Sequence, residues 1–261
     1  MKRTIHDWLR HFENHRAGWS APDWEHLPPC RLDPERRRLL AESLAIFQIG
    51  ETGGGTRLRR FVTESAGLGG RSREAVYARA VDLFIAEEND HARLLAGLVG
   101  YLGGELKRKH WANSVFRSVR TWLGLEFNLQ VLLTAELIAD AYYGLLARAV
   151  PDAVVSEVCG RIVRDEAGHI GFHRTYFSLR HRGRLPVGTA LWGLQFQMLY
   201  LMAEGLVWRE HGACLRAFGI GRAPFQSRGR AACRRFLSLP DGGAGEADVA
   251  FPASPAVDSA S

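Results

Sequence analysis

The motif Glu-x-x-His occurs twice in this sequence, at Glu88–His91 (ENDH) and at Glu166–His169 (EAGH). Residues three positions apart lie on the same face of an α-helix, so the carboxylate and the imidazole of each motif can bind one cation together. One such motif arises readily by chance. Two motifs, each on the apolar face of a helical pattern, indicate a metal site shared by two helices.

A further acid lies level with the first motif if the two helices around it form an antiparallel hairpin. Glu51 and Glu88 are equally distant from the glycine-rich segment 67–70, where the predicted turn lies. Residues at equal distances from such a turn are at the same height along the two helices. Glu42 lies about half a helical rotation from Glu51, so Glu51 is the better candidate ligand.

The second motif gains a partner acid in the same way. Glu136 and Glu166 are equally distant from Pro151, where the preceding helix is expected to stop. Glu126 does not share the helical face of Glu136 and is the weaker candidate. The four glutamates of the set are also the expected catalytic groups. The predicted metal ligands are Glu51, Glu88, His91, Glu136, Glu166 and His169.

The types of these side chains limit which metal ions the site is expected to bind. Each acid interrupts an apolar stripe at mid-helix, and unpaired carboxylates in a core cost several kcal/mol each, which bound cations offset. Carboxylates and imidazoles without a thiolate favour iron or manganese over structural zinc. The sequence therefore predicts two iron ions, and it leaves open whether manganese replaces one of them.

The residues around the two motifs extend the pattern to EENDH (Glu87–His91) and DEAGH (Asp165–His169). With these motifs the chain resembles the ferritin-like diiron-carboxylate superfamily, in particular its bacterial diiron oxygenase and acyl-carrier-protein desaturase branch. The resemblance covers the core from Glu51 to His169. The family commonly has an arginine before each histidine, and here Asp90 and Gly168 replace it.

The resemblance also implies roles for residues beside the ligands. In the family, the acid before each ligand glutamate often hydrogen-bonds the histidine of the opposite motif, which points to Glu87 and Asp165. His173 lies one helical turn beyond His169; it is either a seventh ligand or a histidine that supports the site or packs in the core. Asp140, one turn past Glu136, is expected to support the ligands.

The predicted fold class is all-α. The expected architecture is a ferritin-like four-helix bundle with a crossover between its second and third helices, plus extra N-terminal and C-terminal helices. The expected helices are 33–66, 72–101, 120–150 and 152–181, followed by 185–208 and 225–237. The expected organisation is an N-terminal strap at 1–32, a diiron domain at 33–238 and a disordered tail at 239–261.

The composition of the chain indicates its cellular location and which binding partners are expected. The four cysteines are far apart, and the basic start has no apolar core of signal-peptide length, so we expect a cytoplasmic protein. The net charge of +6 comes without a nucleic-acid-binding motif, and nucleic acid is not an expected partner. Segment 185–208 is about long enough to cross a membrane, but Gln195, Gln197 and Glu204 argue against a span. A homodimer is left open.

The expected function is that of a dioxygen-activating, non-haem diiron oxidoreductase of the hydroxylase, N-oxygenase or desaturase-like type. We expect a small, apolar organic substrate, free or tethered to a carrier. The chain has no flavin, nicotinamide or iron–sulfur motif, so electrons must come from a separate reductase or ferredoxin. The alternatives are ferroxidase or iron-handling activity, peroxide reduction, and a scaffold with a structural metal site. Gly53-Gly54-Gly55 either open space beside Glu51 or break the first helix.

Overall fold

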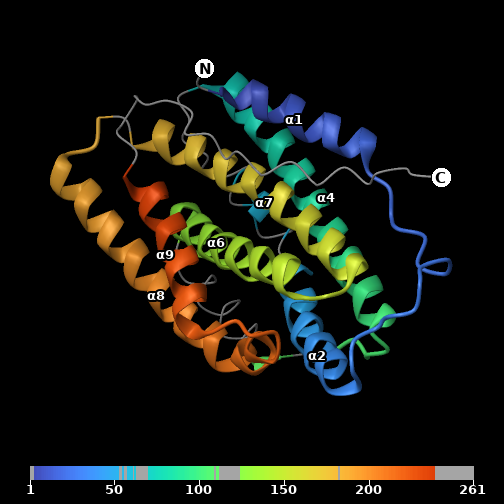
Figure 1. Ribbon diagram of the computed structural model, residues 1–261. Helices are drawn as coiled ribbons and strands as arrows, with labels where there is room; N and C mark the ends of the chain where they lie inside the picture. The colour runs from blue at the N-terminus through green and yellow to red at the C-terminus, as the bar shows by residue number, and fades with distance from the viewer. Residues whose placement is uncertain are drawn as a thin grey trace, which may run out of the picture.

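The computed structural model describes residues 3–52, 55, 58–60, 62, 70–108, 110–111, 124–181 and 183–238. These residues form helices, turns and irregular connections, with no strand among them, which confirms the predicted all-α class (Figure 1). The predicted tail at 239–261 lies outside the described residues. The helices are α1 (Ile5–Gly18), α2 (Pro34–Glu51), α4 (Arg71–Tyr101), α6 (Leu125–Ala149), α7 (Ala153–Arg180), α8 (Pro186–Ala217) and α9 (Arg222–Leu237).

Local sequence explains several of the helix starts. The side chain of Asp33 accepts a hydrogen bond from the backbone N–H of Arg36 at 3.0 Å, and Pro34 occupies the first helical position of α2. This is the predicted start of the helix, and its acid and proline suit the unpaired N–H groups there. Asp152 caps α7 in the same way by accepting from two backbone N–H groups.

The helix expected at 33–66 is interrupted. In the structure α2 ends at Glu51, because Thr52 has an extended backbone with φ −84° and ψ 134°. Gly53 and Gly54 follow outside the described residues, whereas Gly55 is again helical. A break fits the low helix propensity of consecutive glycines. It places Glu51 at the last position of α2.

The other helices agree with expectation except at some ends. Helix α4 follows Gly70 as its cap residue, with no side-chain cap bond, and begins at Arg71, one residue before the expected start at 72. Residues 112–123, which include the later part of the predicted crossover, lie outside the described residues. Helix α8 continues to Ala217, beyond the expected end at 208.

The helices pack around one apolar core. Helix α2 packs against α4, α6 packs against α7, and α4 contacts α7. Helix α1 lies across α4 and α7, while α8 and α9 cover α6 on the other side (Figure 1). Among the described helices, α6 alone has the length and hydropathy of a membrane span, and most of its apolar stretch is buried inside the protein. Its apolar character is therefore accounted for by the core.

Candidate metal centre

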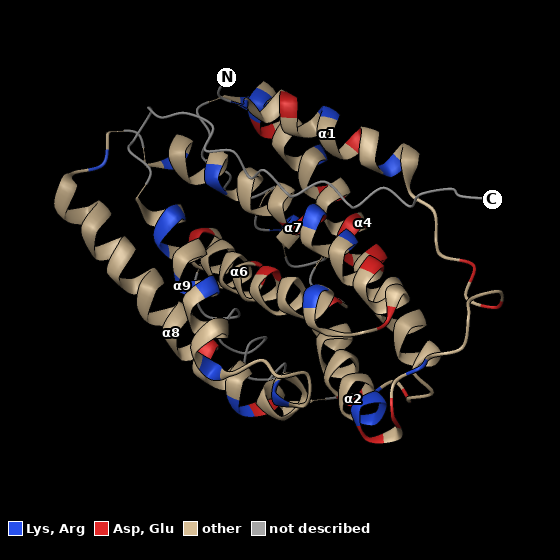
Figure 2. Ribbon diagram, in the orientation of Figure 1, with Lys and Arg blue, Asp and Glu red and all other residues tan. Residues whose placement is uncertain are grey.

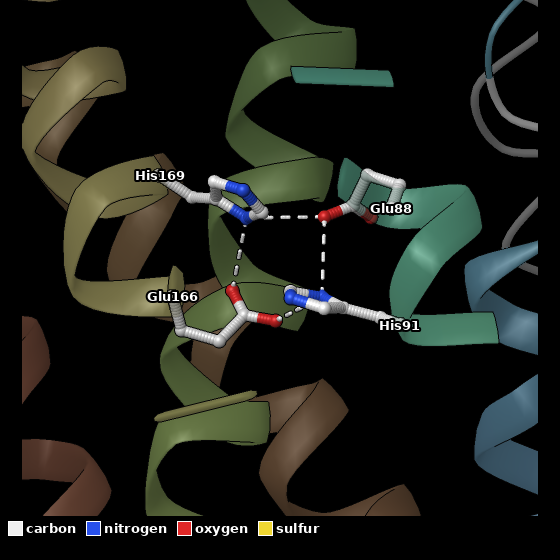
Figure 3. A group of neighbouring side chains, drawn as sticks. All are labelled: Glu88, His91, Glu166 and His169. Carbon is white, nitrogen blue, oxygen red and sulfur yellow. Dashed lines mark ion pairs between the residues drawn. The ribbon is translucent and has the colours of Figure 1, made fainter. Parts of the chain in front are cut away.

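The two Glu-x-x-His motifs meet in the core between α4 and α7. Glu88 and His91 of α4 face Glu166 and His169 of α7, and one ligand atom of each lies within 4.8 Å of all the others (Figure 3). His91, Glu166 and His169 are almost completely buried, and the Glu88 side chain is 19% exposed. Helical spacing brings each pair together, and the packing of α4 on α7 joins the two pairs.

The atoms that face one another are the Nδ1 atoms of the histidines and the carboxylate oxygens. His169 Nδ1 lies 3.1 Å from Glu88 Oε1 and 3.4 Å from Glu166 Oε2. His91 Nδ1 lies 3.6 Å from Glu166 Oε1 and 3.9 Å from Glu88 Oε1. Each imidazole therefore faces both carboxylates, and the four side chains surround a common point.

The outer nitrogen of each imidazole has a different partner. His169 Nε2 lies 3.0 Å from Glu87 Oε2, and His91 Nε2 lies 3.1 Å from Asp165 Oδ2, both at hydrogen-bond distance. Each acid thus contacts the histidine of the opposite motif. A carboxylate bonded to Nε2–H fixes the ring orientation and leaves the Nδ1 lone pair directed into the cluster.

The electrostatics of the cluster are those of crowded, buried acids. Burial raises the pKa of Glu166 to about 7. Burial also opposes ionisation of Glu88, but the nearby imidazole of His169 lowers its pKa to about 2. For His169, burial lowers the pKa, and the carboxylates of Glu166, Glu87 and Glu88 outweigh it and hold that pKa well above its ordinary value. The cluster therefore favours positive charge at its centre.

The donor atoms fit a metal ion. Glu88 Oε1, Glu166 Oε2, His91 Nδ1 and His169 Nδ1 are buried, and none makes a hydrogen bond of good geometry within the described part of the chain. Buried polar atoms without partners are costly, and a cation satisfies all four together. Ligands about 2.1 Å from one ion lie roughly 3.0–3.4 Å from each other, close to the shorter separations seen here.

Glu51 adjoins the cluster without belonging to the group of four. Its carboxyl group lies close to the carboxyl groups of Glu88 and Glu166 and to the imidazole of His169. Burial, followed by the charges of Glu88 and Glu166, raises the pKa of Glu51 well above its ordinary value. Glu51 is therefore harder to ionise than a free glutamate, and it lies at the end of α2, where the sequence symmetry predicted a ligand.

Glu136 makes a separate pair with His173. Glu136 Oε1 lies 2.9 Å from His173 Nε2, and both side chains are buried. Glu136 Oε2 and His173 Nδ1 make no hydrogen bond to the described residues. His173 follows His169 by one turn of α7, so this pair lies next to the candidate metal centre along the helix. The structure does not bring Glu136 into the group of four.

Two other acids of α6 have cationic partners elsewhere. The carboxylate of Asp140 contacts the guanidinium of Arg228 on α9 at 3.3 Å, so it is directed to that helix. Glu126 lies 3.0 Å from both His181 and Arg184, and its close contact with His181 and the guanidinium of Arg184 lower its pKa to about 2 despite partial burial. Glu126 is thus bound in an ion pair at the end of α7.

Helix α1 adds residues that were not among the predicted site residues. His15 Nδ1 lies 3.3 Å from Glu87 Oε1 and 3.7 Å from Asp165 Oδ1, so one imidazole spans both outer acids. His11 stacks beside His15, with ring centroids 4.2 Å apart. The spacing of four between these histidines on an amphipathic helix was the available signal, but it did not reveal which helices α1 would cover.

Both positions at which the motifs lack the family arginine contact α1. Asp90 is buried and binds Arg16 at 2.9 Å. A Cβ atom on Gly168 would lie 2.8 Å from His11 Nε2, closer than real contacts allow. The two departures therefore allow α1 to lie directly over the outer acids of the cluster.

Comparisons of the chain with protein-family models, with curated proteins and with solved structures find no significant match. The features of the chain that bear on its function are therefore the residues and the geometry of the cluster. These residues belong to α4 and α7, with Glu51, Glu136 and His173 beside them.

Proposed function

We propose that this protein is a non-haem diiron oxidoreductase that activates dioxygen. The observation that carries the proposal is the group of Glu88, His91, Glu166 and His169, in which both Nδ1 atoms face both carboxylates. Two imidazoles oriented by carboxylates, around buried acids, are typical of metal-binding helical bundles. The absence of a thiolate from this donor set favours iron over zinc.

Glu88 and Glu166 would hold the metal together with His91 and His169, since each carboxylate faces both histidines. Glu51, which lies beside Glu88, would complete the site on the α2 side. Glu136, whose Oε2 makes no hydrogen bond to the described residues, would complete the site on the α6 side. His173, which contacts Glu136 Oε1, would either be a further ligand or support Glu136. Glu136 Oε2 and His173 Nδ1 lack hydrogen-bond partners among the described residues, and a second ion held there would satisfy both atoms.

The arrangement that we propose for these elements is ferritin-like. Helices α2 and α4 would form one hairpin and α6 and α7 the other, with the crossover between α4 and α6. Helices α1, α8 and α9 are additions that a minimal metal-binding bundle does not need. Packing of α2 on α4, of α6 on α7 and of α4 on α7 supports this assignment.

Iron held at this site would supply dioxygen reduction coupled to oxidation of an organic substrate, as in hydroxylation, N-oxygenation or desaturation. The protein residues orient the ligands and exclude water. Glu87 and Asp165 hold the imidazoles, while Phe84 and Phe172 are buried next to His173. These apolar walls favour an apolar substrate, free or carrier-tethered, and a separate reductase or ferredoxin would provide electrons in a cytoplasmic setting.

The test is anaerobic loading of the full chain with ferrous iron, followed by Mössbauer spectroscopy and exposure to dioxygen. We expect two irons per chain that become a magnetically coupled pair. The matched control is Asp140→Asn, which changes an acid of α6 that binds Arg228 and should retain both irons.

Three results would contradict the proposal. Binding of one iron or fewer per chain removes the diiron site. Preferential binding of manganese at one position would change the metal assignment to a mixed site. Oxidation of many ferrous ions per chain, without oxidation of added organic substrates by reductant and dioxygen, would assign the site to iron handling.

A further inference from the structure

Helix α8 has an exposed face of large apolar side chains. Nine large apolar residues are exposed in the described part of the chain, and seven of them lie in or just before α8. On the helix itself their exposed fractions range from 41% to 70%. They are Val187, Leu191, Leu194, Met198, Leu201 and Met202. Monomers rarely expose a contiguous apolar patch of this kind without a partner for it.

The exposed residues are regularly spaced. Positions 187, 191, 194, 198 and 201 follow one another at intervals of four, three, four and three, which is the spacing of a heptad seam. The opposite stripe of α8, with Phe196, Tyr200 and Ala203, is buried in the core. Helix α8 is therefore apolar on two sides, and its outer side has the pattern that packs against another helix.

The face is also uncharged. Residues 186–203 contain no Lys, Arg, Asp or Glu, and Figure 2 shows α8 without charged residues along most of its length, at one edge of the molecule. Membrane-surface helices normally carry Lys and Arg on their polar side, and charged partners need complementary charges. An uncharged apolar face instead packs well against another uncharged apolar face. The α8 helix of a second copy of this chain provides such a face.

We propose that α8 packs antiparallel against α8 of a second copy, forming a symmetric homodimer. A two-fold axis near Leu194 and Gln195 would place Leu191 of one copy opposite Met198 of the other. The same patch is then used by both copies, as a two-fold interface requires. The exposed side chains amount to roughly 500 Å² per copy, more than half of the about 800 Å² that each partner of a standard interface contributes.

Sedimentation equilibrium of the full chain at micromolar concentration tests the interface. We expect a dimer of twice the 29.1 kDa chain mass. Leu191→Glu should raise the dimer dissociation constant at least 100-fold, because it introduces charges into the seam. Leu106→Glu changes an exposed leucine outside α8, 51% accessible, and should leave the dimer unchanged. Circular dichroism verifies that both variants are folded.

A charge-pair design tests the antiparallel arrangement. Met198→Lys alone should weaken the dimer as Leu191→Glu does. The double variant Leu191→Glu/Met198→Lys should recover to within about tenfold of the wild-type constant, since each glutamate would meet a lysine of the other copy. A double variant as weak as the single ones overturns the antiparallel pairing. A monomeric wild-type chain, or a dimer that Leu191→Glu leaves intact, overturns the interface.

Vesicle flotation separates this proposal from membrane docking. Neutral phosphatidylcholine vesicles and vesicles with anionic lipid should both leave the wild-type protein in the bottom fraction. Flotation of the wild type that is lost in Leu191→Glu would assign the face to a lipid surface and overturn the proposal.

Discussion

Glu87 of α4 contacts His169 of α7, 82 residues away in the sequence, with 3.0 Å between Oε2 and Nε2. Asp165 makes the reciprocal contact with His91 at 3.1 Å. The two motifs are thus connected by their outer acids as well as by the side chains that face the centre. His15 of α1 contacts both of these acids, so Glu87, Asp165 and His15 form an outer layer around the two imidazoles.

Glu87→Gln tests the contribution of this outer layer. The amide can still accept a hydrogen bond from His169, but it lacks the charge that makes the imidazole a stronger ligand. We expect metal affinity to fall by about 10–100-fold. Anaerobic titration with ferrous ion, or competition with Mn²⁺, measures it. Asp140→Asn is the control, and equal affinities for the two variants would show that the Glu87 charge does not support binding.

Glu136→Ala and Glu126→Ala compare two acids of α6. The first removes the buried carboxylate that faces His173, and we expect the loss of at least one iron per chain. The second removes an ion pair with His181 and Arg184, and the iron content should stay at two. Metal analysis of the folded variants measures both. Equal metal content would mean that Glu136 is not a ligand.

Gly171→Ala tests how closely α1 must lie on α7. A Cβ atom at this position would lie 2.5 Å from Cη2 of Trp8, whose Nε1 donates to Thr175 at 2.8 Å. The free-energy cost of overpacking should exceed the gain in helix propensity from alanine, so the variant should be destabilised by about 1–2 kcal/mol.

Gly160→Ala on the same helix is the matched control for that substitution. Among the described residues, its Cβ would meet only Arg164, at an ordinary distance of 3.6 Å. Alanine should therefore stabilise α7 by up to about 1 kcal/mol. Urea unfolding compares the two variants, and a stabilising Gly171→Ala would show that α1 is not held against this glycine.

His211→Asn tests a buried histidine away from the metal centre. Burial, with His110 and Lys107 adding to it, lowers the pKa of His211 to about 3, and its Nδ1 lies 2.7 Å from Ser43 Oγ. The unfolded chain binds this proton below about pH 6.5, whereas the folded protein does not until about pH 3. The neutral histidine thus favours folding above pH 6.5, and this stability is lost as the pH falls through that window.

The asparagine variant should flatten this pH dependence. The contribution of one such group reaches about 1.4 kcal/mol per pH unit. Urea unfolding from pH 7.5 to 4.5 measures the slope for the variant and the wild type. His26→Asn, at an exposed position, should keep the wild-type slope. An unchanged slope in His211→Asn would show that this residue does not couple folding to protonation.

The sequence determined the features that depend on neighbours along the chain. The caps at Asp33 and Asp152 and the stop before Pro151 are local, and the structure has them. The spacing of three within each Glu-x-x-His motif is a property of one helix. The symmetry of a hairpin about its turn was a less precise guide: Glu51 lies beside Glu88, whereas Glu136 contacts His173, one helical turn beyond His169.

Tertiary packing decided the rest. Whether Glu51 ends a helix, whether Glu136 faces His173, and which helices α1 covers depend on contacts between segments far apart in sequence. The same holds for α8, whose two apolar sides look alike in sequence although one is buried and the other exposed. The two Glu-x-x-His motifs could be identified from the sequence because helical periodicity is local, whereas the distances between them depend on side chains that fill the space between helices.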